Sequence, residues 1–227
     1  MNSISSVPPR KRLEGKVAVI TVHLFHEHGA KVVIADINDN LGQAIVEKLG
    51  ERVSYIHCDV SNEDDVCNLI DTIIAKHVQL DIMYSNAGII DRVNMVGAFL
   101  EAKHAARVKI PQRKGCILFT SNASASIAGL SSQAYAASQS GLLGLVRNLA
   151  AELGQYGIRV NCVSPYAVVI SSGMLQQSAE EAAKTEMPVN EIGNLKGHIL
   201  KAIDVAKVAL YLISEDANCW KEGRLLE

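Results

Sequence analysis

The stretch LDIMYSNAG, residues 80–88, decides the fold of this chain, because a short apolar run here stops at a turn of small residues. Such a run, bounded by Asn and Gly, is typical of a strand buried in a parallel sheet. Similar runs rich in Val and Ile occur at residues 16–21, 31–37, 52–60, 115–121 and 158–165. Segments with helical periodicity alternate with them, at residues 41–49, 63–76, 96–108, 134–153 and 203–214. This alternation predicts an α/β fold with a doubly wound parallel sheet in a single domain.

The bulk composition restricts the kind of partner. The chain has 227 residues, is 48% hydrophobic and carries a formal net charge of -2, so one sizeable core is expected. Positive and negative charges are mixed along the chain, which argues against a single-signed surface for nucleic acid. No apolar run approaches the roughly 18 residues of a membrane span. We therefore expect a small-molecule partner, no nucleic acid and no membrane.

The cysteines, the histidines and the N-terminal stretch give no sign of secretion or of a metal site. The five cysteines show no CxxC spacing, which predicts neither a disulfide framework nor zinc. His23, His26 and His28 are clustered, but a solvated helix explains them better than metal ligation. Residues 1–12 lack the apolar segment of a secretory signal and are interpreted as a disordered tail, with a short transit peptide as the alternative. A cytoplasmic location is expected.

The carboxyl ends of the predicted strands are the expected place for a site. Right-handed crossovers between parallel strands bring these ends to one edge of the sheet, where ligands of such sheets bind. Six residues close the predicted strands: Thr21, Asp36, Asp59, Asn86, Ser121 and Pro165.

Four motifs carry a resemblance to a known family: YSNAG (84–88), CDV (58–60), YAAS (135–138) and VNCVSP (160–165). In order and spacing they resemble the short-chain dehydrogenases, in particular the plant enzymes that oxidise terpenoid, lignan and related secondary alcohols. The resemblance implies a Rossmann-type domain over residues 13–218, with residues 219–227 as an atypical C-terminal tail. It also implies a nicotinamide dinucleotide and catalysis by a Tyr, a Lys four residues later, an upstream Ser and an Asn.

The resemblance assigns the strand ends to the cofactor. A carboxylate at Asp36 can accept hydrogen bonds from the adenosine ribose and repel a 2'-phosphate, which favours NAD over NADP. Asp59 and Val60 match the family's adenine contact, and residues 86–88 match its NAG turn, where small residues let the backbone approach the cofactor. Ordinary turn or surface roles are the alternative for each. The expected cofactor residues are Thr21, Asp36, Asp59, Val60, Asn86, Ala87, Gly88, Tyr135, Gln139 and Pro165.

The phenol of Tyr135 matches the family's catalytic acid/base. A phenol with a pKa near 10 must be held as phenolate to accept a proton from an alcohol, and a Lys one helical turn later supplies the positive charge. That position is Gln139 in this chain. Glutamine can bind a ribose hydroxyl but has no charge, so the loss of phenolate stabilisation is on the order of 1.4 to 4 kcal/mol.

Two asparagines complete the expected catalytic set. Alignment on the SIAGL stretch (126–130) and on Tyr135 places the family's catalytic Ser at Asn122, whose amide can donate to a substrate oxygen. Ser121 lies next to it, but strand alternation turns its side chain away. Asn94 matches the helix Asn that anchors a proton-relay water in the family, with an ordinary helix position as the alternative.

The first βαβ unit departs furthest from the family pattern. The family places a glycine-rich phosphate loop after the first strand, whereas only residues 22–30 separate the first two strands here. A βαβ crossover usually needs about 10 to 12 residues or more, so this unit is expected to be shortened. Without the glycines, a pyrophosphate loses its main set of backbone donors. The segment between Gly88 and Asn94 is also short, and the family's last strand is expected to be missing.

These features leave two functions open. The first is an NAD-dependent oxidoreductase that transfers hydride between a hydrophobic secondary alcohol or ketone and nicotinamide, impaired in this chain. The second is a catalytically inactive relative, a pseudoenzyme or the product of an altered transcript or gene reading, that acts at most by association. The family resemblance implies a homodimer or homotetramer, and the apolar residues of the predicted substrate lid (167–197) suit a hydrophobic alcohol.

Overall fold

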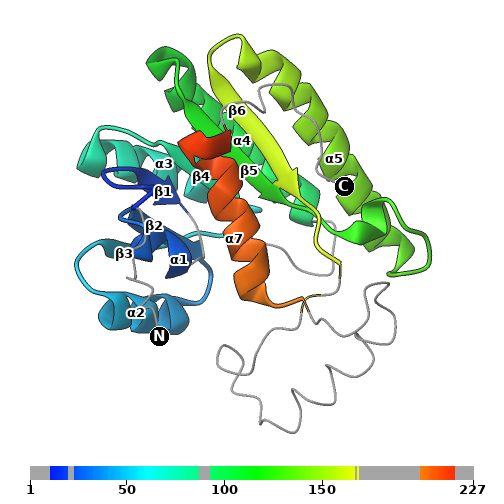
Figure 1. Cartoon of the computed structure of the whole chain (residues 1–227), viewed down its shortest axis with the longest axis horizontal. Helices are drawn as coiled ribbons and strands as arrows, with labels where there is room; N and C mark the ends of the chain where they lie inside the picture. The colour runs from blue at the N-terminus through cyan, green and yellow to red at the C-terminus, as the bar shows by residue number, and fades with distance from the viewer. Residues whose placement is uncertain (1–10, 20–22, 87–92, 167, 169–199, 218–227) are drawn as a thin grey trace, which may run out of the picture.

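The computed structural model describes residues 11–19, 23–86, 93–166, 168 and 200–217. Six parallel strands form one sheet in the order β3-β2-β1-β4-β5-β6 (Figure 1). The order reverses between β1 and β4, which is the switch point where open α/β sheets bind ligands. The predicted doubly wound parallel sheet in a single α/β domain is confirmed.

The strands and helices alternate along the chain as predicted. The strands are β1 (Val17–Val19), β2 (Lys31–Asp36), β3 (Val53–His57), β4 (Ile82–Ser85), β5 (Gly115–Thr120) and β6 (Ile158–Val163). The helices are α1 (His23–Glu27), α2 (Asp39–Leu49), α3 (Glu63–His77), α4 (Val93–Gln112), α5 (Gln133–Gly154) and α7 (Ala202–Ile213), with short 3-10 turns η1 (Ala123–Ala125) and η2 (Glu215–Ala217).

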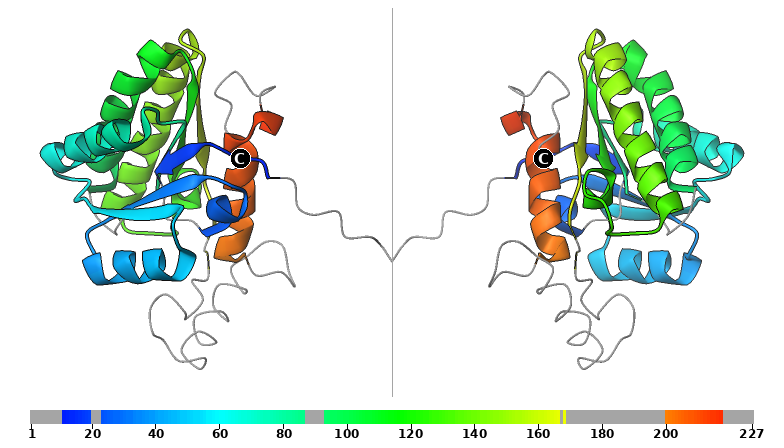
Figure 2. Two further views of the ribbon diagram at one scale, coloured as in Figure 1. Left: turned by 90° about the vertical axis from the view of Figure 1, so that its left-hand side faces the viewer. Right: turned by 90° about the vertical axis from the view of Figure 1, so that its right-hand side faces the viewer.

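Helices cover both faces of the sheet, so the core has two halves (Figure 2). One half packs α3, α4 and α5 against side chains such as Val33, Met83 and Phe119. The other packs α1, α2 and α7 against side chains such as Val32 and Leu118. Neighbouring strand residues alternate between the two halves, which explains why the strands read as continuous apolar runs.

Local capping fixes where the helices begin. Asn38 accepts a hydrogen bond from the backbone N–H of Leu41 at 3.1 Å and so caps α2, and Asn62 caps α3 in the same way. The hydroxyl of Ser132 accepts from the backbone N–H of Tyr135 and caps α5. Each cap satisfies one of the backbone donors that a helix start leaves free. The cap at Ser132 also fixes the backbone of Tyr135 in the first turn of α5.

Element boundaries differ from the sequence predictions in ways that matter for the site. The first strand was expected at residues 16–21, whereas β1 has three residues and α1 has five, so the first βαβ unit is indeed short. β3 and β6 end at His57 and Val163, two residues before Asp59 and Pro165. Those two residues therefore lie in the loops after the strands. The described residues after α7 contain no seventh strand, and the predicted tails at residues 1–12 and 219–227 lie largely outside them.

No helix in the described part of the chain is long and apolar enough to cross a membrane.

Candidate functional site

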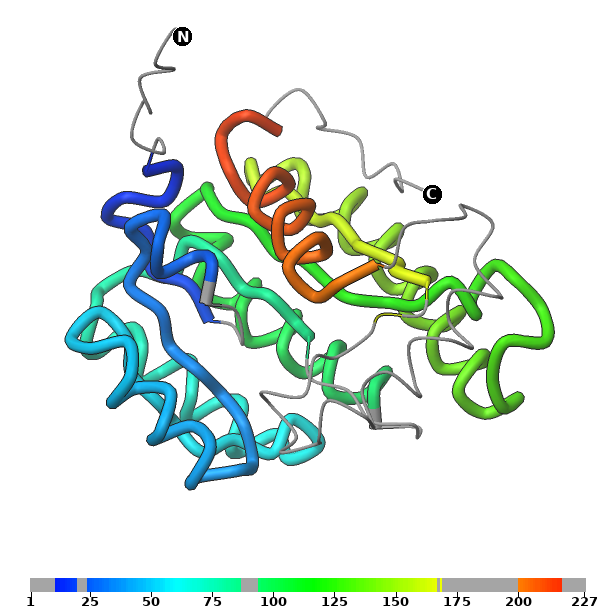
Figure 3. The backbone as a smooth tube through the Cα atoms, turned by 60° about the horizontal axis from the view of Figure 1, so that its bottom comes forward, coloured from blue at the N-terminus to red at the C-terminus, as the bar shows by residue number. Residues whose placement is uncertain are grey.

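The candidate site lies at the edge of the sheet where the strands end, which Figure 3 brings forward. The residues after β2, β3, β4, β5 and β6 all reach this edge because every strand pair is parallel. Thr21, Ala87, Gly88 and most of the predicted lid lie outside the described residues, so their assigned roles stay predictions. In the described part of the chain, no group of three or more His, Cys, Asp or Glu side chains is placed to hold a metal ion.

Asp36 is the last residue of β2, as predicted, and its carboxylate lies at the strand edge. Its Oδ1 accepts from the backbone N–H of Asn38 at 2.9 Å, which tightens the turn into α2. Its backbone carbonyl oxygen lies 2.7 Å from the Tyr55 hydroxyl. The carboxylate is partly exposed and keeps acceptor capacity for ribose hydroxyls.

Asp59 and Val60 follow β3 and lie beside the first turns of α3 and α4. The Asp59 carboxylate accepts from the hydroxyl and the backbone N–H of Ser61, and these hydrogen bonds lower the pKa of Asp59. Val60 packs closely against Gly97 of α4: a Cβ added at Gly97 would lie 2.7 Å from Val60 Cγ2. Gly97 thus lets α4 approach the predicted adenine contact.

Gly97→Ala is therefore expected to destabilise the protein by about 1–3 kcal/mol, because the added methyl group overpacks the contact with Val60. Gly144→Ala is the matched control, since a Cβ at Gly144 in α5 meets nothing within 4 Å. Alanine there should stabilise the helix by roughly 0.5–1 kcal/mol. Urea unfolding of both variants measures the difference, and an equal change in the two would show that the contact does not constrain Val60.

Asn86 follows β4 and is linked to β5 through a chain of hydroxyl groups. Thr120 donates to Asn86 Oδ1 at 2.7 Å, and its Oγ1 lies 2.8 Å from the Tyr84 hydroxyl. The burial of Tyr84 raises the pKa of its phenol, so the phenol stays protonated and can act as a donor. This chain of groups fixes the start of the predicted NAG turn.

Asn122 has a structural role that the sequence did not indicate. Its Oδ1 accepts from the backbone N–H of Ser124 at 2.9 Å and caps η1, while its Nδ2 donates to the carbonyl oxygen of Pro165 at 3.3 Å. The amide therefore joins the loops after β5 and β6. Only its second N–H remains for a substrate, so Asn122 is a weaker substitute for serine than a free amide. Pro165, expected at the cofactor, contributes its carbonyl oxygen to this link.

Tyr135 and Gln139 lie one helical turn apart on α5, as the sequence predicted. Tyr135 is half-buried, and burial raises the pKa of its phenol. Gln139 is 4% exposed, and its side-chain oxygen has no hydrogen-bond partner among the residues that the structure describes. An unpaired buried acceptor costs stability unless a donor binds it, so Gln139 is suited to accept from a ligand hydroxyl. The hydroxyl of Ser121 donates instead to the backbone oxygen of Gln139, at 3.4 Å.

Sequence reasoning missed a buried carboxyl group beneath this edge. Asn94 lies in the first turn of α4 and is buried, and two turns later Glu101 is buried against the end of β4. The Ser85 hydroxyl donates a hydrogen bond to Glu101 Oε2. Burial raises the pKa of Glu101 to about 7. No local pattern marks Glu101 as buried, because its partner Ser85 belongs to a different element.

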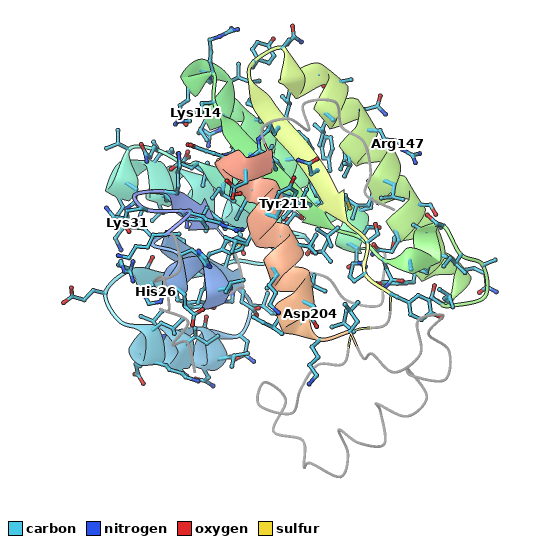
Figure 4. The ribbon with its side chains drawn as sticks, in the orientation of Figure 1. His26, Lys31, Lys114, Arg147, Asp204 and Tyr211 are labelled. Carbon is cyan, nitrogen blue, oxygen red and sulfur yellow. The ribbon has the colours of Figure 1, made fainter. Side chains whose placement is uncertain are left out.

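A cavity of about 460 Å³ lies at the opposite edge of the sheet. It is lined by the starts of β4, β5 and β6 and by the end of α7, including Lys114. Figure 4 shows Lys114 and Asp204, in the first turn of α7, at opposite ends of the sheet. Lys16, which also lines the cavity, lies 3.8 Å from both Asp81 and Glu215. The cavity therefore belongs to the edge away from the strand ends and is not the candidate site.

Comparison with known proteins agrees with this architecture. Residues 16–221 match a protein family described as enoyl-(acyl carrier protein) reductase. The chain is 54% identical over 246 residues to (21S)-21-acetoxyl-apo-melianone synthase SDR of Melia azedarach, over 96% of this chain and 90% of the relative. It is 49% identical over 246 residues to (+)-borneol dehydrogenase 1 of Salvia officinalis, over 96% and 93% of the two chains. Both alignments are longer than this chain, so each relative has residues that this chain lacks.

A solved structure of a related protein has the same fold. The short-chain type dehydrogenase/reductase from Mycobacterium marinum superposes with a TM-score of 0.82 at 26% identity, over 95% of this chain and 94% of that chain. The sheet and these matches define a Rossmann-type oxidoreductase. The chain belongs to the short-chain dehydrogenase/reductase family, with relatives among the plant alcohol dehydrogenases.

Proposed function

We propose that this chain is an NAD-dependent oxidoreductase for a hydrophobic secondary alcohol or ketone, and that its turnover is impaired. The observation that carries the proposal is that Asp36 ends β2, Asp59 lies in the loop after β3 and Tyr135 lies in the first turn of α5, all at or next to the carboxyl ends of the strands. The relative named (+)-borneol dehydrogenase supports an alcohol as the substrate class.

The residues present fit the two ends of a nicotinamide dinucleotide. Asp36 offers a partly exposed carboxylate for the adenosine ribose, and Asp59 with Val60 offers the adenine contact. At the other end, the side-chain oxygen of Gln139, which has no partner among the described residues, is a suitable acceptor for a ribose hydroxyl. NAD, when bound, supplies the hydride acceptor for alcohol oxidation.

The chain's own side chains would handle the proton. The phenol of Tyr135 exchanges a proton with the substrate oxygen, Asn122 donates from its remaining N–H, and Asn94 anchors the relay. Burial raises the pKa of Tyr135, and none of the described residues supplies the missing lysine charge at Gln139. The phenolate is therefore poorly populated near neutral pH, and slow turnover follows.

The second candidate function is a catalytically inactive relative that acts by association. Two observations favour it: the raised pKa of Tyr135, and Asn122 being held by hydrogen bonds within the chain. Such a protein would use α4 and α5, through which the family resemblance implies a homodimer or homotetramer. Both candidates are consistent with a cytoplasmic protein.

Thermal melting with and without NAD tests the two functions. An NAD-binding protein is stabilised by about 2.7 kcal/mol at a hundredfold excess of ligand over its dissociation constant. For a chain of this size, that free energy corresponds to a melting temperature higher by roughly 5–10 °C. AMP is a useful control, because it carries only the adenosine end. A melting temperature unchanged by NAD would favour the inactive relative.

A further inference from the structure

Three side chains beside Asp36 form a hydrogen-bonded cluster outside the catalytic residues. Asp39, the first residue of α2, places its Oδ1 2.8 Å from His57 Nδ1. The Tyr55 hydroxyl lies 2.7 Å from the same Oδ1 and 2.7 Å from the backbone oxygen of Asp36. The cluster thus connects the end of β2, the end of β3 and the start of α2.

The strand register pairs His57 with Asp36 across the ladder between β2 and β3. Asp36 and His57 are direct partners in the parallel ladder, so their side chains project to the same face of the sheet. The side chains of His57 and Asp39 are 54% and 59% exposed. Because Asp39 occupies Nδ1, the second ring nitrogen, Nε2, is the one available to a ligand.

His57 is the group of this cluster whose charge changes near neutral pH. The hydrogen bond to Asp39 and its negative charge raise the pKa of His57, and the carboxylates of Asp65 on α3 and Asp59 add to the effect. When His57 is protonated, it offsets the charge of Asp39. When it is neutral, that positive charge is gone, and the carboxylates of Asp36, Asp39 and Asp59 leave a more negative rim around the place where the adenosine ribose is expected.

We propose that His57, held by Asp39, is a specificity-determining residue for the ribose 2' position of the dinucleotide. Protonated His57 tolerates a 2'-phosphate, and neutral His57 leaves the carboxylates to exclude it. The inference rests on the proposed function, because it needs the adenosine ribose to lie at Asp36. A 2'-phosphate carries between one and two negative charges, since its second pKa is about 6.

Calorimetric titration of NAD and NADP between about pH 5.5 and about pH 8.5, at constant ionic strength, tests the proposal. In the wild type, the affinity for NADP relative to NAD should fall with rising pH. Over this pH range, the affinity ratio of NADP to NAD should fall by roughly threefold to tenfold more in the wild type than in His57→Gln. This is the effect expected of one unit charge at short range in a largely aqueous environment. Ionisation of the phosphate itself is common to both proteins and cancels in this comparison.

His77→Gln is the matched control, because His77 ends α3 and lies outside the cluster. His77→Gln should keep the wild-type dependence of the NADP-to-NAD affinity ratio on pH. Asp39→Asn should move the midpoint of the pH-dependent change in the affinity ratio to lower pH, since it removes the hydrogen bond and the charge that raise the pKa of His57. Equal pH dependence in the wild type and in His57→Gln would overturn the inference and leave the proposed function intact. Absence of binding for both dinucleotides would overturn the proposed function and the inference together.

Nuclear magnetic resonance of the His57 ring gives a readout without any dinucleotide. We expect 2'-AMP to raise the pKa of His57, because the phosphate favours the imidazolium, and 5'-AMP to leave it nearly unchanged. An equal response to the two nucleotides would contradict recognition of the 2' position.

Discussion

Glu101→Gln is expected to raise the free energy of unfolding by roughly 3 kcal/mol at about pH 8 and to change it little at about pH 4. The Glu101 side chain is buried, and its carboxyl group accepts a hydrogen bond from the hydroxyl of Ser85. Burial raises its pKa from 4.5 to about 7. Glutamine has nearly the same shape and carries no charge, so it removes the cost of ionising a buried group.

The direction of this pH dependence of stability follows from the raised pKa of Glu101. Because the folded pKa lies above the unfolded one, the folded state binds more protons, and its stability is fully present below pH 4.5. That stability is lost as the pH rises toward about 7 and above. Urea unfolding from about pH 4 to about pH 9 measures the profile. Glu152→Gln is the control, because Glu152 is exposed on α5 and should leave the profile unchanged.

Lys109, further along α4, makes a contribution to stability that changes with pH in the opposite direction. It is fully buried, donates to the Leu80 carbonyl oxygen at 2.6 Å, and burial lowers its pKa from 10.5 to about 7. Its contribution is present above pH 10.5 and is lost as the pH falls toward about 7. These two groups together should give a minimum of stability near neutral pH. A wild-type profile that matches that of Glu101→Gln would show that folding does not raise the pKa of Glu101.

The sequence predicted the architecture because parallel strands buried on both faces read as continuous apolar runs. LDIMYSNAG and its five counterparts each contain one strand of the sheet, and Asp36 ends its strand as expected. Five of the helices begin within three residues of the periodic segments that predicted them. The short first unit was also predictable, because nine residues leave little room for a helix and its two loops.

The same reasoning could not locate the buried charges, because α4 lies against the sheet and also against α3 and α5. A helix covered on more than one side has few exposed positions, so residue type does not reveal which polar groups are buried. Glu101 and Lys109 look like ordinary surface residues in the sequence. The role of Asn122 was hidden for another reason: its partner Pro165 is 43 residues away in the chain.

The cluster of Asp39, Tyr55 and His57 was also invisible in the sequence, although its parts flank the predicted strand ends. Asp39 belongs to α2 and the other two to β3, and only the register of β2 against β3 brings them together. Strand prediction gives the period of the side chains but not the partner across the ladder. The spatial pairing of Tyr135 with Gln139 was predictable, because the two residues share one helix and one face.

Gln139→Lys combined with Asn122→Ser is expected to raise kcat for oxidation of a hydrophobic secondary alcohol by about tenfold to a thousandfold. Lysine one turn after Tyr135 supplies the positive charge that stabilises phenolate, against the burial that now raises the pKa of that phenol. Serine restores a hydroxyl and can still cap η1. The rate is followed by the absorbance of reduced nicotinamide across pH, and its rising limb should move to lower pH in the double variant.

Two controls separate charge from packing in this experiment. Gln139→Met keeps the length of the buried side chain without a charge and should give no gain. Adding Tyr135→Phe to the double variant should abolish the gain, because it removes the group whose proton the lysine controls. If the double variant binds NAD and its rate and pH profile stay those of the wild type, the missing charge does not limit turnover. The shortened connection between β1 and β2 would then be the cause, because it changes how the pyrophosphate is held.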